Sequence, residues 1–166
     1  MKKLLVILIM FIGTINISAQ ENNEAILQKI DSLQSQLNEL QIDYEFHKLE
    51  SELHRLHIDL KTFCNEVTCG SNAILISCYQ GYADKELYES YKYKYDASVY
   101  LLDSYKESFN VKKEVLNLKI NKIKFSFLQS KLIDQSINAL NAAFNAAEHS
   151  LNYYKTVMSM YKDLIR

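Results

Sequence analysis

The chain has 166 residues, a formal net charge of −1 and 48% hydrophobic residues. The near-neutral charge disfavours a nucleic-acid-binding protein, because such proteins carry a concentrated basic surface. Proline is absent and glycine occurs only three times, which disfavours sheet-rich and loop-rich folds that need frequent turn residues. The composition therefore predicts an all-α protein with long helices and few connections.

Residues 1–19 have the three parts of a cleavable secretory signal peptide. Lys2 and Lys3 form a basic start, an apolar run follows from residue 4 to 12, and Ala19 precedes the predicted cut. The run is shorter than the roughly 20 residues that span a bilayer; a retained N-terminal anchor is the alternative. We expect export to the periplasm, the cell surface or the extracellular medium, leaving residues 20–166 as a single helical domain.

The first predicted helix covers about residues 22–67 and carries two coiled-coil registers, in which apolar residues alternate at spacings of three and four. The first register is Ile26, Ile30, Leu33, Leu37, Leu40 and Tyr44, and the second is Ile42, Phe46, Leu49, Leu53, Leu56, Leu60, Phe63 and Val67. They are out of phase by two residues, so either the apolar stripe widens or the helix breaks near Tyr44.

A turn is predicted at residues 68–72, where Gly70 can adopt the left-handed conformation that ends a helix. Cys64 and Cys78 are equidistant from this turn and would face each other in an antiparallel hairpin. Exported proteins meet an oxidising compartment, so we predict a Cys64–Cys78 disulfide. A bridge between Cys64 and Cys69 is the rival.

The second predicted helix covers about residues 72–109 and is rich in tyrosine. One stripe suits a core seam of amphipathic rings and comprises Tyr88, Tyr91, Tyr95, Ser98, Leu102, Tyr105 and Phe109. Tyr93 and Tyr100 fall off this stripe, so we expect them to be exposed. An exposed aromatic surface for a glycan or a peptide is the functional alternative.

The third predicted helix covers about residues 111–165, either continuous or split near residues 130–136. Its seam comprises Ile137, Leu140, Phe144, Ala147, Leu151, Tyr154, Met158, Tyr161 and Ile165. Residues 123–127 alternate as in a strand but also fit a helix, which we expect here. The acidic stretch 20–70 and the lysine-rich stretch 112–131 should lie side by side. The fold class is therefore an elongated antiparallel helical bundle, or coiled coil, of three or four long helices.

Four residues on one face of the first helix are weak candidates for a transition-metal site, namely His47, Glu50, His54 and His57. The chain lacks a glycine-rich phosphate loop and a serine nucleophile elbow, and we expect neither a cofactor nor an enzyme. The leading expectation is an exported interaction or structural module that binds a protein partner or itself through helix–helix contacts. The alternatives are a membrane-active helical protein and a metal- or ligand-binding bundle.

Overall fold

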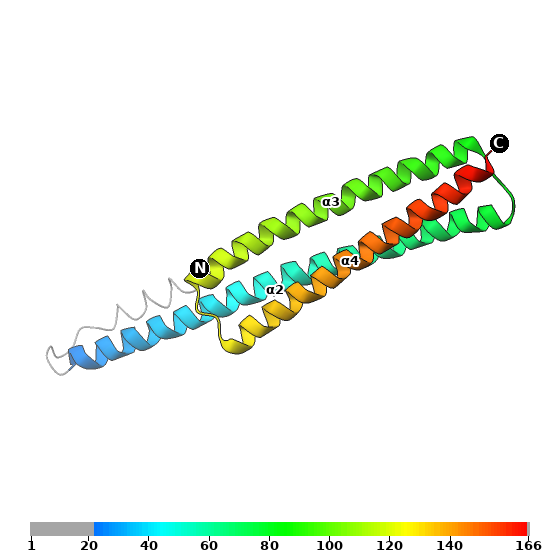
Figure 1. Ribbon diagram of the computed structural model, residues 1–166. Helices are drawn as coiled ribbons and strands as arrows, with labels where there is room; N and C mark the ends of the chain where they lie inside the picture. The colour runs from blue at the N-terminus through cyan, green and yellow to red at the C-terminus, as the bar shows by residue number, and fades with distance from the viewer. Residues whose placement is uncertain (1–21, 166) are drawn as a thin grey trace. The chain divides into compact units, whose positions relative to one another are not determined.

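The computed structural model describes residues 22–165, so the predicted signal peptide at residues 1–19 lies outside the described part of the chain. Three helices make up nearly all of the described residues: α2 (Asn22–Tyr79), α3 (Lys85–Lys122) and α4 (Phe127–Leu164) (Figure 1). The all-α expectation is confirmed. The chain divides between Gln41 and Ile42 into two structural units, so that α2 contributes to both.

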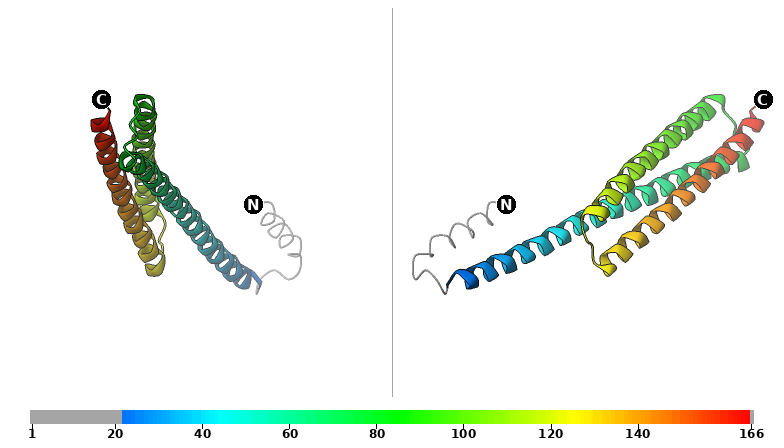
Figure 2. Two further views of the ribbon diagram at one scale, coloured as in Figure 1. Left: turned by 90° about the vertical axis from the view of Figure 1, so that its right-hand side faces the viewer. Right: turned by 60° about the vertical axis from the view of Figure 1, so that its left-hand side comes forward.

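The unit from Ile42 onward is a three-helix bundle. Residues 42–79 of α2 and the whole of α4 run in the same direction, and α3 runs antiparallel to both (Figures 1 and 2). The second register of the first helix is buried in this bundle from Phe46 to Val67. The tyrosine stripe of α3 and the seam of α4 complete the core, with Tyr91, Leu102, Phe109, Leu140, Ala147 and Tyr161 among their buried members. Helical apolar periodicity therefore predicted the packed faces correctly.

The predicted turn at residues 68–72 is wrong, because α2 continues through it as far as Tyr79. Gly70 is helical and allows close packing: a Cβ atom at this position would lie 2.8 Å from Cε2 of Tyr154. The next residue, Ser71, is fully buried and donates a hydrogen bond to the carbonyl oxygen of Val67 over 2.8 Å. Gly70 was expected to end the helix. It is instead the position at which the Tyr154 ring of α4 packs closely against α2.

The first connection of the bundle lies between Tyr79 and Lys85. Gly81 adopts a φ of 66°, a left-handed conformation that suits glycine. Asp84 then caps α3, since its side chain accepts a hydrogen bond from the backbone N–H of Glu86 over 2.9 Å. The backbone N–H of Asp84 donates to the hydroxyl of Tyr161 over 2.9 Å, which ties this connection to the end of α4.

The predicted Cys64–Cys78 disulfide is incompatible with this geometry. All three cysteines, including Cys69, are free thiols on α2. A rise of about 1.5 Å per residue places the Cα atoms of Cys64 and Cys78 on the order of 20 Å apart along one helix, whereas a disulfide needs about 4–7 Å. The Cys64–Cys69 rival also lies within one continuous helix and is unformed. Burial raises the pKa of the Cys64 and Cys78 thiols above the ordinary value.

The second and third predicted helices also have different ends from those expected. Residues 85–122 form α3, which runs through Asn110 without a break, and the connection falls at residues 123–126. The alternating segment 123–127 is therefore mostly a connection rather than a helix: Ile123 is extended, and Phe125 packs edge-on against Phe46. Ser126 and Gln129 then form a reciprocal capping box that starts α4. Within residues 22–165 there are three long helices, and the connection before the last one lies earlier than residues 130–136.

The expected juxtaposition of acidic and basic stretches is confirmed in the bundle. Lys112 Nζ lies 3.0 Å from Glu52 Oε2, and Lys119 Nζ lies 2.5 Å from Glu45 Oε2, joining α3 to α2. These pairs are partly exposed and contribute less to stability than the core does. These ion pairs favour one register of α3 against α2, because each lysine meets its glutamate only in that register.

The ion pair of Glu45 predicts a pH dependence. The hydrogen bond and charge of Lys119 hold the pKa of the Glu45 carboxyl below its ordinary value of 4.5. A depressed folded-state pKa stabilises the fold above the unfolded-state pKa, and this contribution is lost as the pH falls through the folded-state value. We expect the thermal midpoint of the wild type to fall more steeply below pH 4.5 than that of a Glu45→Gln variant. Melting curves followed by circular dichroism measure this difference; parallel curves would contradict it.

Candidate functional site: an exposed apolar stripe on α2

The first register of α2 has a different environment from the second. Its five members in residues 22–41 form what we call the N-terminal stripe: Ile26, Ile30, Leu33, Leu37 and Leu40. Ile26 is half-buried and the other four are exposed, with Leu33 at 46% and Leu37 at 41% of full exposure. Leu60, at a corresponding seam position of the second register, is fully buried. The same heptad spacing thus accompanies a packed core in one unit and a solvent-facing row in the other.

The exposed row is unusual for a helix in water. Most of a helix's stability in a protein comes from packing its apolar face, rather than from intrinsic helix propensity. Full burial of one leucine or isoleucine side chain is worth about 1.5–3 kcal/mol, so the four exposed members leave part of this free energy unrealised. A contiguous exposed apolar surface marks an interaction site in soluble proteins. The N-terminal stripe is therefore the strongest candidate for a binding surface.

The surroundings of the stripe are polar. Within residues 28–41, the side chains between its members are Gln, Ser, Asn, Asp, Glu and a single Lys. An apolar row that is limited to the a and d positions of the heptad is the narrow seam of a coiled coil. Leu27 lies beside the row, is also exposed, and widens it at one point.

The four metal-site candidates line one surface groove of the bundle without forming a ligand set. His47, Glu50, His54 and His57 come from α2, Ser136 and Ala139 face them from α4, and the groove has a volume of about 660 Å³. His47 Nδ1 lies 3.5 Å from Glu50 Oε2, and both side chains are largely exposed. Within the described residues, no group of three or more His, Cys, Asp or Glu side chains is arranged to hold a metal ion. Helical spacing places these four residues along one groove, but it does not bring their side chains close enough together to bind one metal ion.

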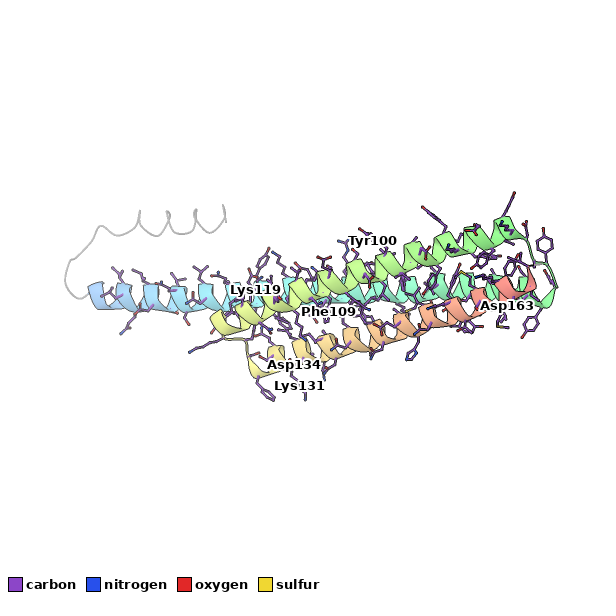
Figure 3. The ribbon with its side chains drawn as sticks, turned by 45° about the horizontal axis from the view of Figure 1, so that its top comes forward. Tyr100, Phe109, Lys119, Lys131, Asp134 and Asp163 are labelled. Atoms are coloured by element: carbon purple, nitrogen blue, oxygen red, sulfur yellow. The ribbon has the colours of Figure 1, made fainter. Side chains whose placement is uncertain are left out.

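Tyr93 and Tyr100 are exposed on α3, as the stripe analysis predicted, at 76% and 80% (Figure 3 labels Tyr100). Residues of the tyrosine stripe itself face the core. Phe109, also labelled in Figure 3, packs on Phe144 of α4 with ring centroids 5.3 Å apart. Tyr93 and Tyr100 are seven residues apart. Tyr93 lies between Lys92 and Lys94 in the chain, and Tyr100 lies between Val99 and Leu101. Neither lines the groove formed by His47, Glu50, His54 and His57.

Phe127 is an exposed aromatic that the sequence pattern did not single out. It ends the segment 123–127 that we expected to be helical, and it is the first residue of α4, with 85% exposure. Its neighbour Leu128 is exposed too. The available signal was the pair Ser126 and Gln129, whose spacing is that of a capping box and places Phe127 in the first turn of a helix.

Comparison with known proteins adds no relative: no protein-family model, no curated protein and no solved structure matches the chain. A search for membrane spans among the described helices finds none with the length and apolar character needed to cross a bilayer.

Proposed function

We propose that the protein is an exported, non-enzymatic interaction module that binds another helix through the N-terminal stripe. The observation that carries the proposal is the exposure of a regular heptad row at Ile30, Leu33, Leu37 and Leu40. In a coiled coil, each such side chain inserts between four residues of the facing helix. The signal-like residues 1–19 support export.

The bundle of residues 42–165 supports this function as a stable support for the binding helix. Its core runs along residues 46–74 of α2, so the chain that follows the stripe is fixed by α3 and α4. A helix anchored at one end loses less conformational entropy when a partner binds than a free peptide does. The bundle thus favours a preformed helix at the stripe.

Capture experiments with matched variants test the proposal. Leu33→Lys with Leu37→Lys places two charges in the stripe, and Gln28→Lys with Ser35→Lys places two charges on the opposite face of the same helix. We expect the wild type and the opposite-face variant to capture the same proteins from the envelope or secreted fraction, and the stripe variant to lose them. Equal capture by the stripe variant would contradict the proposal.

A further inference from the structure

We infer that the helix that binds the N-terminal stripe is the same stripe of a second copy of this chain, parallel and in register. This inference rests on the proposed function and names its partner. In the heptad of residues 22–41, Ile30 and Leu37 occupy a positions, and Ile26, Leu33 and Leu40 occupy d positions. The pair Ile30 at a and Leu33 at d has the β-branched and leucine arrangement that favours two parallel strands, whereas Leu37 at a and Ile26 at d depart from it.

The charges of the flanking residues permit self-pairing. In a parallel pair, a g position of one helix faces the next e position of its partner. The flanks here are Lys29 and Gln36 at g, with the exposed Leu27, Gln34 and Gln41 at e. Lys29 then faces Gln34 and Gln36 faces Gln41, so no two like charges oppose each other. Coiled coils that must reject their own copies place like charges at these positions, and this stripe lacks them.

The acidic residues of the segment lie away from the predicted contact. Asp31 is at a b position and Glu39 is at a c position, both outside the flanks of the seam. Two copies can therefore approach along the stripe without bringing their carboxylates together. The same placement disfavours a lipid surface, because interfacial helices present Lys and Arg on the polar face and a broad apolar face beneath it. A narrow seam with an acidic and amide-rich back matches a helix better than a bilayer.

The contact is limited in length by the change of register. The bundle-facing row begins at Phe46 and is out of phase with the stripe by two residues, which is about 200° around a helix. The residues that serve the bundle core therefore do not continue the stripe. A pairing of about two heptads is short, so we expect reversible association rather than a permanent dimer.

Sedimentation equilibrium of residues 20–166 tests self-association. We expect the wild type and the Gln28→Lys, Ser35→Lys variant to shift from monomer to dimer with rising concentration. The Leu33→Lys, Leu37→Lys variant should remain monomeric with an unchanged thermal midpoint, since its bundle core is intact. A wild type that is monomeric throughout, or a stripe variant that dimerises equally, would overturn the inference.

Orientation is tested in a variant whose three cysteines are replaced by alanine. A cysteine introduced by Leu40→Cys occupies a seam position, and one introduced by Ser35→Cys occupies the outer face. Oxidation should cross-link two copies through the first and not through the second, because only seam positions of a parallel, in-register pair meet their counterparts. Equal cross-linking of both would overturn the parallel arrangement.

The failure of this inference is distinguishable from the failure of the proposed function. A monomeric wild type that still captures another protein in a stripe-dependent manner would exclude self-pairing and leave the proposed function standing. A wild type that neither dimerises nor captures any protein would reject both. Flotation with anionic phospholipid vesicles completes the test: binding by the wild type that the stripe variant loses would replace the second copy with a lipid surface.

Discussion

Replacing Leu60 by alanine should lower the free energy of unfolding by about 2–5 kcal/mol, whereas the same change at Leu37 should alter it by less than about 0.5 kcal/mol in the monomer. Both leucines occupy seam positions of a heptad on α2. Leu60 is fully buried in the bundle, so its truncation removes apolar burial and leaves a cavity. Leu37 is exposed and leaves no cavity.

Urea unfolding of the two variants, followed by circular dichroism at a concentration that keeps the chain monomeric, measures this difference. The wild type and a Ser35→Ala variant, which changes an exposed position on the face opposite the stripe, are the references. A loss at Leu37 as large as that at Leu60 would mean that the chain's own residues cover the stripe. The comparison therefore separates a seam that packs within the chain from one that is open to a partner.

Gly70→Ala should destabilise the bundle, although alanine is the better helix former. In an exposed helix the change is worth about 1 kcal/mol in favour of alanine. Here the new Cβ atom would lie 2.8 Å from Cε2 of Tyr154, a ring that is held by a hydrogen bond from its hydroxyl to the carbonyl of Tyr91 and by packing on Tyr95. Overpacking of a fixed ring costs about 1–3 kcal/mol and is expected to exceed the gain in helix propensity.

A double-mutant cycle makes this prediction specific. In a Tyr154→Leu background the ring is absent, so Gly70→Ala should become stabilising by up to about 1 kcal/mol, which reverses the sign of its effect. Gly81→Ala serves as the control: nothing lies within 4 Å of its Cβ position, and its cost arises from a φ of 66°. That cost should be the same with and without Tyr154→Leu. If Gly70→Ala had the same effect in both backgrounds, the close approach of α4 at Gly70 would be contradicted.

The packed faces of the helices could be predicted from the sequence because helical periodicity is a local signal. Each buried row, such as that from Phe46 to Val67, repeats at spacings of three and four and needs no knowledge of the partner helix. The pairing of α2 with α3 was also foreseen, because their opposite charges are segregated along the chain. Lys112 with Glu52 and Lys119 with Glu45 bear this out.

The turns were predicted less well because glycine has two uses. Gly70 resembled a helix end, but its missing Cβ serves a contact with Tyr154, which is remote in the sequence. The actual connection after Tyr79 contains Gly81, which has a positive φ, and Asp84, which caps α3. The predicted pairing of Cys64 with Cys78 depended on a turn between them, and the two cysteines lie instead on one continuous helix. A local pattern cannot show whether a glycine serves conformation or packing.

The candidate site shows a second limit of sequence reasoning. The heptads before and after Tyr44 look alike as patterns, and the phase difference indicated only a widened stripe or a break. A heptad shows that a residue belongs to a seam but does not show whether that seam is covered within the chain. The exposure of Leu33 and Leu37 supplies this information. The structure therefore adds the distinction on which the proposed function depends.

Amide hydrogen exchange of residues 20–166, measured by mass spectrometry at several protein concentrations, tests the central claim most directly. At low concentration we expect peptides from residues 46–74 to exchange slowly and peptides from residues 22–41 to exchange quickly, because only the former are held by a packed core. As the concentration rises, protection should increase in residues 22–41 alone, and the Leu33→Lys, Leu37→Lys variant should lack that increase. Strong protection of residues 22–41 at every concentration, equal to that of the core, would contradict an open stripe that pairs with a second copy.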